Sequence, residues 1–75
     1  MEKYQNLSGN SGVAAYAITG DSITVKFVDG GTYLYNWQSA GRENIELMKT
    51  LALTGKGLST FIATHVSDQY AAKLS

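Results

Sequence analysis

Residues 23–27 alternate between apolar and polar side chains, and this alternation constrains the fold more than any other feature of the chain. A period of two is typical of a β-strand with one buried face, and we expect that strand to cover residues 22–28. Gly20-Asp21 precedes the strand and Asp29-Gly30-Gly31 follows it, and both motifs predict hairpin turns. The strand should therefore pair on both sides, with partners over residues 13–18 and 32–37.

The period changes after residue 37. Ile45, Met48 and Ala52 recur at helical spacing and predict a helix that begins near an N-cap at Ser39 and ends at Gly55. A second helix is predicted from an apolar stripe with complete helical spacing, formed by Leu58, Phe61, Ile62, His65 and Val66. A third, short helix over residues 67–74, where Tyr70 and Leu74 lie one turn apart, is left open. The predicted fold class is α+β, a three-stranded antiparallel β-meander followed by two or three short helices packed on one sheet face.

Turn lengths predict which side chains share a face. A two-residue Gly20-Asp21 loop of type II′ pairs Ile18 with Ile23, Tyr16 with Val25 and Ala14 with Phe27, which places all six on the core face. In the second hairpin, a three-residue loop at 29–31 pairs Phe27 with Tyr33 and Val25 with Tyr35. Both tyrosines then face the core, and we favour this arrangement. A two-residue loop places Leu34 in the core and both tyrosines outside.

The opposite sheet face is predicted to stay uncovered, because the helices can pack on only one side. It is flat and apolar for a surface in water, and such patches mark interfaces. Thr24, Lys26 and Thr32 belong to it, and its candidate interface residues are Val13, Ala15, Ala17, Val28 and Leu34. We expect a homodimer formed through this face, or a protein partner docked on it.

Composition excludes several classes of site. The 75 residues suffice for one domain, which we place at residues 13–75 after a flexible polar lead-in over residues 1–12. The chain has no Cys and one His, which argues against disulfides and zinc sites and fits a cytoplasmic location. Six basic residues balance six acidic ones, so no overall field attracts nucleic acid or a membrane. We expect no cofactor, no metal and no membrane partner, and the sequence identifies no small-molecule substrate.

The order of several short motifs resembles the KTSC domain, over roughly residues 11–70. The matching features are Tyr16, the Ile23-x-Val25-x-Phe27 strand, Gly30, the Tyr33-Leu34-Tyr35 motif, and Gly55 and Gly57 before Phe61-Ile62. That family is named for its occurrence at the C-terminus of some lysyl-tRNA synthetases and also includes small stand-alone bacterial proteins. The resemblance implies a small domain that covers most of the chain, and the synthetase context suggests RNA binding.

Aromatic and basic side chains provide the alternative to a protein interface, a weak RNA- or DNA-binding module. Exposed aromatic rings stack on bases, and cations meet phosphates. The candidate residues for nucleic-acid binding are Lys26, Tyr33, Tyr35, Trp37, Arg42 and Lys56. No catalytic residues are predicted: the glycines around Lys56 lack the spacing of a phosphate-binding loop. His65 lies on a helical apolar stripe, where we expect it half-buried.

Overall fold

The computed structural model describes residues 1–9 and 11–75, and in this part of the chain it contains one antiparallel five-stranded sheet in the order β1-β2-β3-β4-β5. The strands are β1 (Glu2–Lys3), β2 (Val13–Ile18), β3 (Ser22–Phe27), β4 (Thr32–Asn36) and β5 (Ala72–Lys73). The helices are α1 (Trp37–Ala40), α2 (Arg42–Thr54) and α3 (Leu58–Phe61), and α3 continues into a π-helical turn, η1 (Ile62–Val66). The predicted α+β class is confirmed, with two more strands than the meander.

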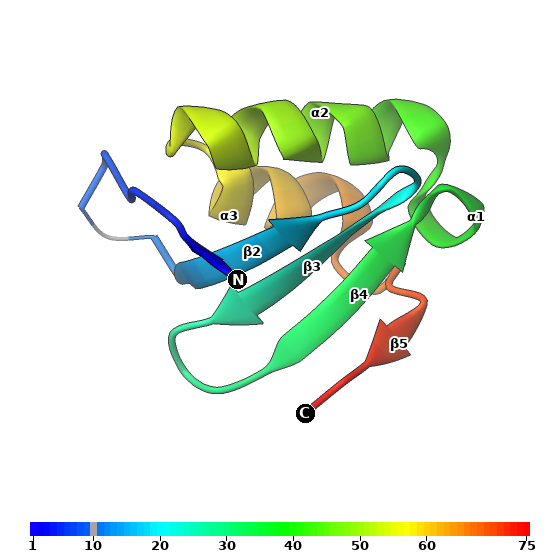
Figure 1. The fold of residues 1–75 in the computed structure, drawn as a ribbon, viewed down its shortest axis with the longest axis horizontal. Coiled ribbons are helices and arrows are strands. Elements are labelled where there is room, and N and C mark those ends of the chain that lie inside the picture. Colours follow the sequence, from blue (N-terminus) through cyan, green and yellow to red (C-terminus); the bar gives the residue numbers. More distant parts are fainter. Residues whose placement is uncertain (10) are drawn as a thin grey trace.

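The hydrophobic core lies between one face of the sheet and the helices. Figure 1 shows α2 and α3 on the same side of the sheet. The sheet contributes Tyr16, Ile23, Val25 and Tyr35, and the helices contribute Ile45, Met48, Ala52, Leu58, Phe61, Ile62 and Val66. The predicted alternation of β3 and the helical stripe of α2 therefore meet in one core, as two packed layers. No helix among the described residues is both long and apolar enough to cross a membrane.

The first hairpin has the predicted register near its turn. Ile18 lies opposite Ile23 and Tyr16 opposite Val25. Gly20 does not have the positive φ that a type II′ turn requires, so the predicted turn type is wrong. The register shifts between Val13 and Ala15, and Val13 rather than Ala14 lies opposite Phe27. This β-bulge turns Val13 toward the core, where it is 1% exposed, and our placement of Val13 on the open face is wrong.

The second hairpin turns through three residues, as predicted, but one residue earlier in the chain. The amide of Phe27 donates to the carbonyl of Gly31 at 2.8 Å, and Gly30 takes a φ of 113° between them. Tyr33 consequently lies opposite Val25 and Tyr35 opposite Ile23, so the predicted partners are shifted by two residues. The shift preserves side-chain direction, and the core-facing placement of both tyrosines is confirmed.

Both ends of the described chain add edge strands to the sheet. β1 pairs with β2, and the following Tyr4 is buried, so the expected lead-in contributes to the same sheet and core; Asn10 lies outside the described residues. At the other end, β5 pairs with β4, with Lys73 opposite Tyr33. The helical interpretation of residues 67–74 is therefore wrong, because backbone pairing with β4 outweighs the helical spacing of Tyr70 and Leu74.

Two helix boundaries rest on specific residues, and the π-helical turn changes which side chains align. Asn36 caps α1 by accepting from the amide of Ser39 at 2.8 Å, so Ser39 is the third residue of α1 and not the predicted N-cap. Gly55 ends α2 in the left-handed conformation, as predicted. In η1 the wider turn aligns Val66, rather than His65, with Phe61. The His65 ring is exposed and stacks on Phe61, so the half-buried placement is wrong.

Candidate functional site

One sheet face carries no helix among the described residues (Figure 1), and we call it the open face. At one end it carries the pair Ser22 and Asn36, and its remaining residues are Lys3, Ala15, Ala17, Thr24, Lys26, Thr32, Leu34 and Ala72. They form two rows across the strands. In one row, Ala17, Thr24, Leu34 and Ala72 are successive cross-strand neighbours, whereas the other runs from Lys3 through Ala15 and Lys26 to Thr32. The first row has no charge and the second has two.

The predicted interface residues divide between three places. Ala15, Ala17 and Leu34 lie on the open face, half-buried by their neighbours. Val28 lies in the turn after β3 and is 67% exposed. Val13 lies in the core.

The six candidate nucleic-acid residues are not brought together. Lys26 lies on the open face, whereas Tyr33 and Tyr35 lie on the opposite face. Trp37 and Arg42 lie at the start of α1 and α2, with the guanidinium 4.9 Å from the centre of the indole ring. Lys56 lies between α2 and α3. A single strand of nucleic acid would have to contact both sides of the sheet to reach all six.

Trp37 belongs to a polar network on the surface of α2. Its indole N–H donates to a carboxylate oxygen of Glu46 at 3.2 Å, and the Lys49 ammonium donates to the same oxygen at 2.9 Å. Lys49 also donates to the carbonyl of Gly20, which ties α2 to the β2–β3 turn. The bond from Lys49, then that from Trp37, lowers the pKa of the exposed Glu46 carboxyl. These contacts account for the positions of the Trp37 and Lys49 side chains without a ligand.

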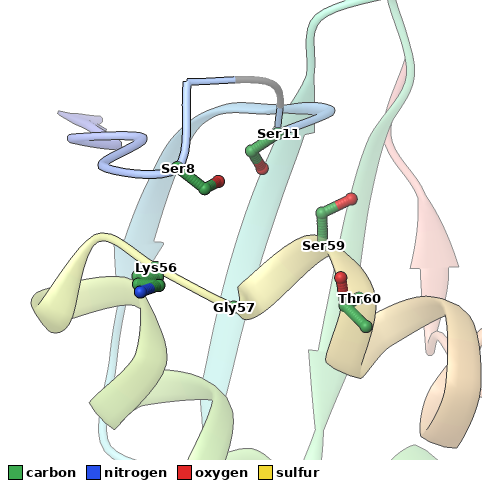
Figure 2. Close-up of a pocket in the computed structure, with 6 residues that line it drawn as sticks. All are labelled: Ser8, Ser11, Lys56, Gly57, Ser59 and Thr60. Carbon is green, nitrogen blue, oxygen red and sulfur yellow. The ribbon is translucent and has the colours of Figure 1, made fainter.

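Lys56 borders a small hollow of about 260 Å³ between the N-terminal segment and α3 (Figure 2). It is lined by Ser8, Ser11, Lys56, Gly57, Ser59 and Thr60. Two of the nearby groups already have partners, since the Leu58 amide donates to the Tyr4 hydroxyl and the Ser11 hydroxyl accepts from Val13. None of the lining side chains is buried. We therefore assign no ligand to this hollow.

A larger depression lies where the core face of the β3–β4 hairpin extends beyond α2, and we call it the aromatic groove. It consists of two hollows of about 320 and 450 Å³ that share Phe27, Asp29 and Tyr33. Tyr35, Tyr70 and the helical turn at Ile62 and Ala63 line the smaller one, and Gly31 and Lys73 line the larger. π-Helical turns such as η1 occur frequently at functional sites.

The aromatic rings of the groove contact one another. The ring centres of Tyr33 and Tyr70 are 4.8 Å apart, those of Phe27 and Tyr33 are 5.7 Å apart, and those of Tyr35 and Tyr70 are 6.4 Å apart. Tyr70 is 40% exposed, whereas Tyr35 is 1% exposed. The groove therefore has a buried aromatic floor and an exposed aromatic rim.

Tyr35 lines the smaller hollow of this groove with a side chain that ends in a hydroxyl. In the described part of the chain the Tyr35 hydroxyl has no hydrogen-bond partner. Every side-chain oxygen or nitrogen that is fully buried there does have a partner. The Tyr35 oxygen is therefore not fully enclosed, although the residue as a whole is only 1% exposed. Burial, with the neighbouring Tyr33 and Tyr70 phenols, raises the pKa of Tyr35 to about 12, so this hydroxyl keeps its proton at neutral pH and can donate it in a hydrogen bond.

Sequence reasoning missed the groove because two of its residues have other local interpretations. Tyr70 lies in the segment whose helical interpretation is left open, and Asp29 is a turn residue. The sequence does contain a signal for the groove. Side chains alternate between the two faces of a strand, and this alternation puts the rings of Phe27, Tyr33 and Tyr35 on one face near the end of a hairpin. Among residues 1–9 and 11–75, no three His, Cys, Asp or Glu side chains cluster as metal ligands would.

Comparison with known proteins adds no relative. No family model, no curated protein and no solved structure matches this chain.

Proposed function

We propose that this protein is a small non-catalytic interaction module that self-associates through the open face, as a homodimer. The supporting observation is the uncharged row of Ala17, Thr24, Leu34 and Ala72, which crosses four neighbouring strands and is covered by none of the helices in the described residues. Small side chains of this kind allow two sheets to pack face to face. The KTSC assignment and a cytoplasmic location remain part of the proposal, supported by the motif order and the absence of cysteine.

The lysine row favours one dimer geometry. One possible two-fold axis runs along the uncharged row, across the strands. With this axis, the Lys3 and Lys26 of one copy lie at one end of the interface, and those of the other copy lie at the opposite end. They then face the polar row of Ser22 and Asn36. An axis along the strands instead sets the two lysine rows against each other, which like-charge repulsion disfavours.

The size of the open face indicates a weak dimer. At about 4.8 Å between strands and about 3.3 Å per residue, the sheet offers roughly 400 Å² of flat area per protomer. The total of roughly 800 Å² for the two protomers lies below the standard size of specific protein–protein interfaces, in the range of weak and transient contacts. We expect dissociation constants in the micromolar to millimolar range.

Sedimentation equilibrium across that concentration range tests the proposal. The wild-type chain should dimerise to the same extent at low and near-physiological salt. Thr24→Arg places a long charged side chain at the centre of the uncharged row and should give a monomer. Thr50→Arg is the matched control, because Thr50 lies exposed on α2 and the variant should dimerise like wild type. A wild-type chain that stays monomeric at millimolar concentration contradicts the proposal.

Nucleic-acid binding is the second candidate, and Lys26 with Lys3 on the open face is what favours it. The same experiment with a short labelled single-stranded RNA separates the two. Binding through phosphate contacts should weaken steeply as salt rises. A monomer that binds RNA at low salt and releases it at higher salt supports the second candidate, and a dimer that ignores RNA supports the first.

A further inference from the structure

The aromatic groove and the open face lie on opposite faces of the sheet. A partner bound in the groove therefore does not compete with one bound at the open face. The two hollows of the groove adjoin through the shared residues Phe27, Asp29 and Tyr33. A ligand that fills both must therefore pass over the ring of Tyr33. This continuity indicates an extended ligand rather than a compact one.

The ring contacts decide how such a ligand lies. Tyr33 and Tyr70 touch each other, at 4.8 Å between ring centres, so no flat ring or nucleobase can insert between them. The available surface is instead a series of ring edges and faces along the groove. Extended segments with a polyproline II backbone dock on aromatic-lined grooves of this kind, because proline rings pack on aromatic rings and the backbone is already ordered.

The Tyr35 hydroxyl indicates which groups the ligand must supply. It is a proton donor at the wall of the smaller hollow without an acceptor in the described protein. An occupant that displaces water must offer an acceptor there, since an unpaired donor is costly once it is desolvated. Proline residues have carbonyl acceptors and no N–H, so a proline-rich segment supplies acceptors without bringing donors that would themselves need partners.

The charge of Asp29 indicates which residue the ligand carries beside its prolines. Asp29 lines both hollows, and the smaller hollow has no Lys or Arg in its lining. A carboxylate at this position attracts a cationic side chain and repels phosphate. Lys73 lines only the larger hollow, with its ammonium 5.8 Å from the centre of the Tyr33 ring. The basic residue of the ligand is therefore expected at the smaller hollow.

We propose that the aromatic groove binds a proline-rich peptide segment that carries one basic residue, with the prolines over Tyr33 and Tyr70 and the basic side chain at Asp29. A free proline-rich tail of another protein is the source we expect.

Nuclear magnetic resonance titration of the ¹⁵N-labelled chain tests this proposal. The probe is an acetylated peptide of one arginine followed by eight prolines, and the control peptide has glycine and serine in place of the prolines. The proline peptide should shift amide signals around Phe27, Tyr33, Ala63 and Tyr70, and the control peptide should not. Absence of shifts at millimolar peptide, or equal shifts with both peptides, overturns the proposal. Shifts in the groove with a single-stranded RNA and none with the peptide overturn it too.

Pairs of matched variants test which side chains contribute to peptide binding. Tyr70→Ala should weaken binding at least about fivefold, as loss of an interface aromatic does. Tyr35→Phe removes only the hydroxyl and should weaken binding roughly three- to tenfold, whereas Tyr16→Phe, outside the groove, should leave it unchanged. Asp29→Asn should reduce the preference for arginine over a neutral residue in the peptide, and Asp21→Asn in the other hairpin turn should not. Preserved signal dispersion shows that each variant is folded, and unchanged affinity in Tyr35→Phe and Tyr70→Ala contradicts the proposed pose.

Discussion

The hydroxyl of Tyr4 accepts a hydrogen bond from the backbone N–H of Leu58, 54 positions away in sequence, at 3.2 Å. Leu58 begins α3, so its N–H has no partner within the helix. Tyr4 is 2% exposed and joins the core cluster. This single contact makes the N-terminal segment part of the cap of α3, and it turns an apparent lead-in into a structural element.

Tyr4→Phe should lower the free energy of unfolding by about 1–3 kcal/mol, because it keeps the ring but leaves a buried N–H unsatisfied. Urea denaturation followed by Trp37 fluorescence measures the change. Tyr70→Phe is the control, since the Tyr70 side chain is 40% exposed and its substitution should leave stability nearly unchanged. Equal stability of Tyr4→Phe and wild type would show that water replaces the hydroxyl.

Gly55→Ala should destabilise the protein by about 1–3 kcal/mol, because Gly55 has a φ of 82° and an added Cβ would lie 2.7 Å from the Cβ of Gln5. Gly20→Ala is the matched control: its φ is not positive, and nothing lies within 4 Å of an added Cβ. That variant should unfold within about 0.5 kcal/mol of wild type or be slightly more stable. Thermal unfolding of the two variants in parallel checks the difference.

The Glu46 carboxyl should titrate below its ordinary pKa of 4.5, because Lys49 and then Trp37 donate hydrogen bonds to its charged form. A pKa lowered by folding means that the contribution to stability is present above about pH 4.5 and is lost as pH falls through the folded value. The chemical shift of the Trp37 indole N–H should report this transition. Lys49→Met should move its midpoint upward, and a midpoint at or above 4.5 in the wild type contradicts the network.

Tyr35 should be the late step in an alkaline titration, because burial raises its pKa to about 12 from the ordinary 10.0. A raised folded pKa means that stability from this group is complete below pH 10 and is lost as pH rises through about 12. Ultraviolet absorbance of tyrosinate measures the step. Tyr35→Phe should remove the latest phase and flatten the fall in stability over that range, whereas Tyr70→Phe should leave the latest phase in place.

Local pattern was enough to predict the centre of the sheet. The alternation around Ile23 and Val25 and the two-residue spacing at Gly20-Asp21 determine which residues face each other in β2 and β3. Parity alone placed Tyr33 and Tyr35 on the core face, and a register shift of two residues could not alter it. Gly55 ended its helix as predicted, because few other residues adopt its backbone conformation without strain.

What sequence reasoning missed depends on contacts between distant segments. The bulge that buries Val13 has no signature in residues 13–15, since both arrangements put an apolar residue opposite Phe27. Tyr4 stands in a polar stretch, and only its contact with Leu58 shows why it is buried. The helical spacing of Tyr70 and Leu74 was a local preference that pairing with β4 overrode. The groove combines these distant parts and so escaped prediction.

The place of β5 in the sheet has a consequence for folding. The other adjacent strands follow one another in sequence, whereas β4 and β5 are separated by all the helices. Contacts between nearby residues form early and distant pairings form late, so β5 should dock last and detach first. Tyr70 lies two residues before this strand, which means that the rim of the aromatic groove exists only once the chain has completed folding. A peptide bound there would hold the last strand in place and slow its amide hydrogen exchange.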